Sequence, residues 1–225
     1  MRLLLLLCLA SIAAHAGFGA KPPVVTMNVS RGEYNGWAEI VHTSGNLPHA
    51  VELTVKEREL DLDGNIVKDT ITPAKDFIVH PANILLAPGK TVKVQIVYKG
   101  PKVETDKVYT LHVKEIALPE GQKEQAITMG LAVRVNYNVG ILMNTGKPGS
   151  MAFVSSKALD SGKVEVIMEN KGKGKFLLEN INLYANNSKA LEFKAKVNSV
   201  MPGQQRRFVF DYHKPLTAKE VYFGK

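Results

Sequence analysis

"QAITMGLAVRVNYNV", residues 125–139, alternates apolar side chains with small or polar ones along its length. An alternation with a period of two residues is typical of a β-strand that has one apolar face. A single charge, Arg134, lies on the opposite face. The apolar face consists of Ile127, Met129, Leu131, Val133 and Val135. The rest of the sequence must show what this face is buried against.

The chain from Val24 onward repeats the alternation in short segments. Turn sequences separate them, among them DLDGN (61–65) and APGK (87–90), where glycine supplies an unusual backbone conformation. About seven such segments precede Val139 at roughly ten-residue spacing, which is typical of an immunoglobulin-like sandwich. The sequence therefore predicts an all-β protein.

A stretch rich in glycine and proline, GILMNTGKPGS at 140–150, interrupts the alternation. Such a composition is common in linkers between domains. The segments that follow alternate again, which predicts a second, smaller sandwich. We therefore expect two immunoglobulin-like β-sandwich domains in tandem, one over residues 17–139 and one over residues 151–225.

Residues 1–16 have the features of a secretory signal peptide. Arg2 precedes an apolar run, and the run ends in the small-x-small sequence Ala14-His15-Ala16. The run is shorter than the roughly 20 residues that span a bilayer, so we expect cleavage rather than membrane insertion. Cys8, the sole cysteine, would leave with this segment. The exported chain would then rely on packed cores instead of disulfides.

The composition argues for a binding protein rather than an enzyme. The net charge of +8 favours acidic partners or carboxylates, and an exported protein rarely meets nucleic acid. The histidines are scattered without metal-binding spacing, and neither a Gly-x-Ser-x-Gly elbow nor a cysteine nucleophile is present in the exported chain. The expectation is a protein without metal, cofactor or catalytic residues.

Two arginines are candidates for an anion site. Arg31 follows the first predicted strand, and Arg134 lies in the last predicted strand of the same domain. If these strands are neighbours, two guanidinium groups could bind one carboxylate. The alternative is that both arginines face solvent or pair with Glu33 and Glu39.

Four segments resemble the periplasmic pilus chaperones of the chaperone-usher family. They match, in order, the opening strands of that family, its central Pro-Gly signature, its strand ending in a Glu-Ile-Pro-like turn, and its basic-x-x-Tyr segment. The segments are SRGEYNGWAEIVHTSGNLPHAVEL (30–53), FIVHPANILLAPGKTVKVQIVYKG (77–100), DKVYTLHVKEIALPE (106–120) and AVRVNYNV (132–139). The short turn at 119–125 resembles the short-loop branch of the family.

The resemblance implies a function and a set of partners. A chaperone of this kind completes the unfinished sandwich of a pilus subunit with its own strand, by donor-strand complementation, and passes the subunit to an outer-membrane usher. The apolar face of the opening stretch would then fill the subunit through Ile127, Met129 and Leu131. Arg31 and Arg134 would bind the subunit's C-terminal carboxylate.

The sequence also departs from the family pattern. Where the family usually has a lysine, this sequence has Arg134. Where the family has an arginine of an interdomain ion network, this sequence has Asn138, although Asp106 and Asp211 lie near the acidic positions of that network. Whether an ion network joins the domains therefore stays open, as does self-association of the free protein. The alternative functions are a pilus subunit or adhesin, and a generic secreted β-sandwich binding module.

Overall fold

The structure is a computed structural model that describes residues 17–116, 134–159, 162–178, 182–185, 188–189, 199–212 and 214–224. Within these ranges the regular structure consists of β-strands and one short 3-10 helix, η1 (Val29–Arg31). No helix in the described ranges is long and apolar enough to cross a membrane. The predicted all-β class is confirmed.

Two sheets form the N-terminal domain. The first contains, in spatial order, β1 (Phe18–Lys21), β3 (Asn35–His42), β8 (Thr91–Tyr98) and β6 (Phe77–His80). The second contains β2 (Val24–Asn28), β10 (Asn136–Asn144), β9 (Lys107–Ile116), β4 (His49–Leu60) and β5 (Ile66–Pro73), and β7 (Asn83–Leu86) also pairs with β4.

One apolar core fills the space between these sheets. Every second residue of β10 is buried in it, namely Val139, Ile141 and Met143. β3 and β8 contribute Ile40 and Ile96 from the opposite sheet. Because apolar residues alternate along each strand, one face of each sheet is buried and the other is left for contacts outside the core.

The N-terminal strand changes sheets at a pair of prolines. β1 pairs antiparallel with β3, whereas β2, which follows Pro22 and Pro23, pairs parallel with β10. The register of the second pair places Val24 beside Gly140 and Asn28 beside Asn144. β2 is therefore the outermost strand of the second sheet, and it covers only the second half of β10.

The C-terminal domain has its own core. Its main sheet contains β11 (Met151–Leu159), β12 (Lys163–Asn170) and β17 (Gln205–Asp211). Val166, Met168 and Phe208 are among the residues buried in this core. Shorter pairs complete the domain, formed by β13 (Phe176–Leu177) with β16 (Ser199–Val200), and by β14 (Asn182–Ala185) with β15 (Ser188–Lys189) and β18 (Val221–Gly224).

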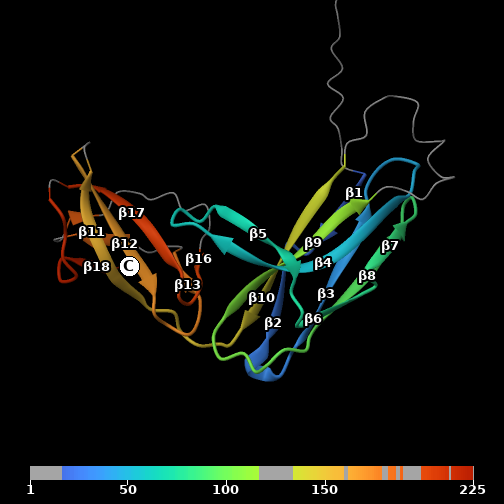
Figure 1. The fold of residues 1–225 in the computed structure, drawn as a ribbon, viewed down its shortest axis with the longest axis horizontal. Helices are drawn as coiled ribbons and strands as arrows, with labels where there is room; N and C mark the ends of the chain where they lie inside the picture. The colour runs from blue at the N-terminus through green and yellow to red at the C-terminus, as the bar shows by residue number, and fades with distance from the viewer. Residues whose placement is uncertain are drawn as a thin grey trace, which may run out of the picture.

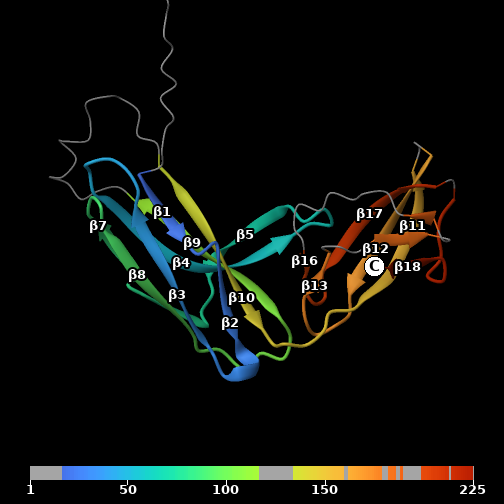
Figure 2. The same cartoon turned by 180° about the vertical axis from the view of Figure 1, so that it is seen from behind.

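The two domains lie side by side, and Figures 1 and 2 show them joined at their lower end by the segment between β10 and β11. In both views the hairpin formed by β4 and β5 points from the first domain toward β16 and β17 of the second. The linker therefore connects the domains at one end, and the β4–β5 hairpin reaches from the first domain to the second at another place.

The predicted linker begins too early. β10 continues through Asn144, so residues 140–144 belong to the second sheet, and only residues 145–150 lie between the strands. Ile141 and Met143 have no exposed surface, because they continue the apolar alternation of the strand. Gly140 interrupts that alternation in the sequence but permits close approach of β2, since a Cβ there would lie 3.3 Å from Val24 Cγ2.

Candidate functional site

The first half of β10 has an open edge. On one side β10 pairs with β9 along Asn136 to Met143. On the other side β2 pairs with it only from Gly140 onward, starting with the bond from Gly140 N–H to Pro23 O at 2.9 Å. Among the described residues, no strand pairs with this outer side ahead of Gly140.

The backbone groups that face the open edge can be assigned from these bonds. The carbonyl of Val135 accepts a hydrogen bond from Glu115 N–H at 3.2 Å, so the backbone N–H and C=O groups of odd-numbered residues in β10 point toward β9. The N–H of Gly140 points toward β2, so the backbone groups of even-numbered residues point away from β9. Asn136 and Asn138 therefore direct their N–H and C=O groups at the open edge. Such groups can pair with a strand of another molecule.

The outer face of the same sheet is polar and basic beside this edge. Asn136 is in register with Lys114 of β9, and Gly140 is in register with Thr110 and, through it, with Lys56 of β4. Lys114 is exposed and Lys56 is half-buried. Lys114 lies one strand away from the edge strand, on β9, and Lys56 lies two strands away, on β4.

The half-buried carboxylate of Glu115 holds the start of β10. Glu115 Oε2 accepts the N–H of Val135 at 3.0 Å, and Glu115 Oε1 lies 2.7 Å from His49 Nδ1. The side chains of Glu115 and His49 are only 17% and 19% exposed. The rings of His42 and Phe18 lie 5.3 Å and 5.4 Å from that of His49. The first residues of the open edge are therefore fastened to β9 and β4.

A buried carboxylate, Asp106, joins the two domains. It is 3% exposed and accepts three hydrogen bonds, from Thr145 N–H at 2.7 Å, from Thr145 Oγ1 at 2.6 Å and from Lys175 N–H at 2.9 Å. Its own N–H donates to Lys173 O at 2.8 Å. Gly174 passes so close to the linker that a Cβ there would lie 1.6 Å from Lys147 O. The β12–β13 turn is thus bonded directly to the base of the first domain.

This junction settles part of the question about an interdomain ion network. Asp106 is part of the junction, but its partners are backbone N–H groups and a hydroxyl rather than an arginine. Asp211 lies 4.0 Å from Lys163 of its own domain and is mostly exposed. Asn138 is exposed on β10, six residues before the strand ends. At this junction, hydrogen bonds to the carboxylate of Asp106 are found where the resemblance implies ion pairs.

The tip of the β4–β5 hairpin makes the other contact between the domains. Leu62 O accepts the N–H of Arg207 at 3.0 Å, and Asp63 lies 3.6 Å from the Arg207 guanidinium. Arg206, only 4% exposed, donates to Asp61 O at 3.3 Å. Burial lowers the pKa of Arg206, and the charge of Asp61 acts in the opposite direction. The side-chain hydrogen bond from Asn65 lowers the pKa of Asp61 in the turn itself.

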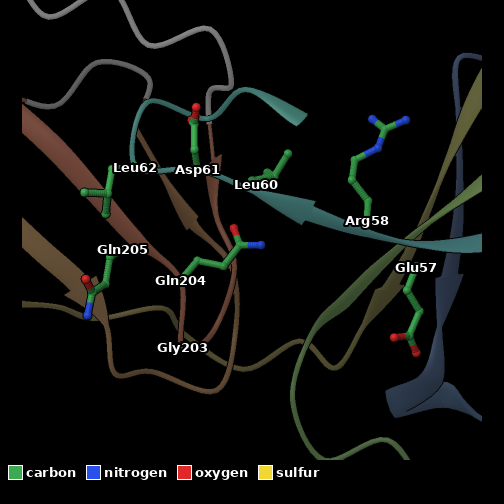
Figure 3. Close-up of a pocket in the computed structure, with 8 residues that line it drawn as sticks. All are labelled: Glu57, Arg58, Leu60, Asp61, Leu62, Gly203, Gln204 and Gln205. Carbon is green, nitrogen blue, oxygen red and sulfur yellow. The ribbon is translucent and has the colours of Figure 1, made fainter. Parts of the chain in front are cut away.

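A cavity of about 640 Å³ lies between this hairpin and the turn that precedes β17. Figure 3 shows Gln204 extending from that turn toward the strand that carries Leu60 and Arg58. A smaller cavity of about 270 Å³ adjoins it and is also lined by Arg58, together with Lys107 and Met201. The interdomain space is therefore lined by both polar and apolar side chains, with cations and carboxylates together on the N-terminal side.

Sequence reasoning missed Arg58 and Lys107 because both are single charges on alternating strands, which usually face solvent. Only the position of the hairpin relative to β17 reveals that they line a cavity. The same applies to Glu115 and His49, which are 66 residues apart in the chain. No local spacing pattern could have linked them.

The structure does not bring the two predicted anchor arginines together. Arg31 ends η1, immediately after β2, and therefore lies near Asn144 at the end of β10. Arg134 precedes the start of β10. About ten extended residues separate these positions, which corresponds to roughly 30 Å. A single carboxylate cannot contact both.

The alternative pairing partners are also engaged elsewhere. Glu33 accepts a hydrogen bond from Asn28 at 2.8 Å, and Glu39 lies 3.1 Å from Lys21. Arg31 and Arg134 are both exposed, and neither forms an ion pair with another described residue. The predicted groove-filling residues Ile127, Met129 and Leu131 lie outside the described residues.

Comparison with known proteins rests on structure alone, because no protein-family model and no curated protein matches this sequence. The chaperone–tip adhesin complex of CFA/I fimbriae matches with a TM-score of 0.58 at 12% identity, over 93% of this chain and 98% of the other. The CsuC–CsuE chaperone–tip subunit complex from the archaic chaperone-usher Csu pili of Acinetobacter baumannii matches with a TM-score of 0.57 at 16% identity, over 92% of each chain.

The class 5 fimbriae chaperone CfaA matches equally well, with a TM-score of 0.57 at 12% identity over 92% of this chain and 97% of the other. These solved structures are a fimbriae chaperone and complexes of chaperones with tip subunits. At such low identity the likeness establishes the fold. The chain has the fold of the chaperone-usher pilus chaperones, with two immunoglobulin-like β-sandwich domains in tandem.

Proposed function

We propose that this protein is a periplasmic chaperone that holds a pilus subunit by donor-strand complementation and delivers it to an outer-membrane usher. The signal-peptide pattern of residues 1–16 supports export, and the fold is that of pilus chaperones. The alternating face of Ile127, Met129 and Leu131 supplies side chains suited to an apolar groove in the subunit.

The open edge of β10 is the observation that carries this proposal. Proteins usually cover or shorten exposed strand edges, because unpaired N–H and C=O groups attract other strands. Here β2 begins only at Val24, which leaves the backbone groups of Asn136 and Asn138 unpaired by any described strand. An extended segment of a subunit can pair there, and its side chains select the register.

The position of β2 sets where such a partner strand ends. One end of the added strand stops at Pro23, where β2 takes over the edge, and from there the strand passes Arg134 toward Ile127, Met129 and Leu131. Arg134 therefore remains the candidate for a carboxylate or acidic side chain on this strand. Arg31 lies beyond the open edge and would need a different part of the partner.

Co-expression with a subunit encoded beside its gene tests the proposal. We expect a soluble one-to-one complex in the periplasm. The matched control is the same subunit fused to its own completing strand, which fills the groove and should abolish binding. Equal binding of the fused subunit, or recovery of this protein alone, would contradict the proposal and favour a generic binding module.

A further inference from the structure

The bonds around Glu115 end the β9–β10 ladder in an unusual way. Lys114 pairs with Asn136 at the end of the ladder, and because the strands are antiparallel, the next facing pair is Glu115 and Val135. In a regular antiparallel pair of this kind, two residues exchange two backbone hydrogen bonds. Here Glu115 N–H donates to Val135 O, but Val135 N–H donates to the side-chain carboxylate of Glu115. The carboxylate takes the place of a backbone acceptor at the point where pairing stops.

His49 fixes the orientation of that carboxylate. Its Nδ1 lies 2.7 Å from the second carboxylate oxygen, so both oxygens of Glu115 are engaged. The imidazole has little freedom to move, because its ring lies against those of Phe18 and His42 and because a Cβ on Gly17 would lie 2.2 Å from its Nε2. His42 is itself held, since its Nε2 lies 3.0 Å from Leu47 O.

We propose that Glu115 and His49 are positioning residues that keep the open edge of β10 in strand conformation before a partner binds. This inference rests on the proposed function. Fixing the backbone of a residue costs conformational entropy. If the start of β10 is already fixed to β9, a partner strand meets a preorganised edge and does not have to order it.

Three variants separate this role from general stability. Glu115→Ala removes the acceptor of Val135 N–H. Glu115→Gln keeps an oxygen for Val135 N–H, and its amide can donate to the other tautomer of His49. Glu52→Ala is the matched control, because Glu52 is an exposed carboxylate of β4 in register with Lys114.

The first measurement is amide hydrogen exchange in the free full-length protein. Val135 N–H should be protected in the wild type, in Glu115→Gln and in Glu52→Ala, and should lose its protection in Glu115→Ala. The amide of Leu111, deep in β9, should stay protected in all four proteins. Continued protection of Val135 in Glu115→Ala would overturn the inference without involving any partner.

The second measurement is the affinity for the co-expressed subunit. We expect Glu115→Ala to bind about tenfold more weakly, as for loss of a hydrogen bond to a charged group, and Glu115→Gln to recover most of the affinity. Wild-type affinity in a Glu115→Ala protein whose Val135 exchanges freely would overturn the inference. If even the wild type fails to bind, the proposed function fails, and with it the role in binding.

Discussion

Replacing Asn136 with proline tests whether a partner strand pairs with the open edge of β10. The N–H of Asn136 points away from β9, so its removal takes no hydrogen bond from the protein's own sheet. Proline is tolerated on edge strands when the missing N–H would face outward. Tyr137→Pro is the matched control one residue later, because the N–H of Tyr137 faces β9 and its ring packs 5.3 Å from that of Phe18.

The expected magnitudes differ for the two variants. One backbone hydrogen bond contributes about 0.5–1.5 kcal/mol net. Asn136→Pro should therefore weaken subunit binding by about twofold to thirteenfold and leave the melting temperature nearly unchanged. Tyr137→Pro leaves a backbone acceptor of β9 without its donor, which costs about 1–3 kcal/mol. Its melting temperature should fall by about 2–4 °C for each of these kcal/mol.

Calorimetric titration with the subunit, and thermal unfolding followed by circular dichroism, give the two quantities. Unchanged affinity of a folded Asn136→Pro protein would refute pairing at this edge. A fall in the melting temperature of Asn136→Pro as large as that of Tyr137→Pro would refute the assignment of the edge as open. Only selective loss of binding in the first variant agrees with the reasoning.

Three further predictions follow from other parts of the structure. In a double-mutant cycle of Arg31→Ala and Arg134→Ala, the effects on subunit affinity should add within about 0.5 kcal/mol, because the two residues are far apart. A larger coupling energy would mean that they share one ligand. In chemical denaturation, Asp106→Asn should lower the free energy of unfolding by about 1–3 kcal/mol, since the new amide places an N–H donor against the donors around it. The control Asp211→Asn, at an exposed carboxylate, should change the free energy of unfolding by about 0.5 kcal/mol or less. Burial raises the pKa of Tyr109 to about 12, so stability should fall as pH rises above the unperturbed value of 10.0. In an ultraviolet titration of the folded protein, Tyr109→Phe should remove a phenol transition near pH 12, and an unchanged transition there would contradict this.

The fold could be predicted because its signal is local. Alternation along residues 125–139 predicts a strand with one apolar face, and in the described part of this stretch the structure buries Val139 on that face. The same logic misplaced the start of the linker, because Gly140 and the turn residues after Asn144 suggest a break. The parallel pairing with β2 overrides that local signal, and it depends on a strand more than 100 residues earlier.

The polar contacts could not be predicted in the same way. The resemblance places Asp106 near an acidic position of an interdomain ion network, yet no local pattern names its partners, which are Thr145 and the backbone of Lys175. Its environment depends on how two separately folded cores meet. A buried carboxylate requires donors at hydrogen-bonding distance, and those donors come from segments that no sequence period relates.

The separation of Arg31 from Arg134 shows which step of the sequence reasoning failed. The expectation that the first and last strands of the domain are neighbours is correct, since β2 pairs with β10. Adjacency does not fix where along a strand two residues lie, however, and the parallel register places Arg31 near the end of β10 while Arg134 precedes its start. A partner strand that pairs with the open edge can contact Arg134 but must stop at Pro23. A subunit that engages both arginines must therefore use two separate segments, and the additivity of the two substitutions measures whether it does.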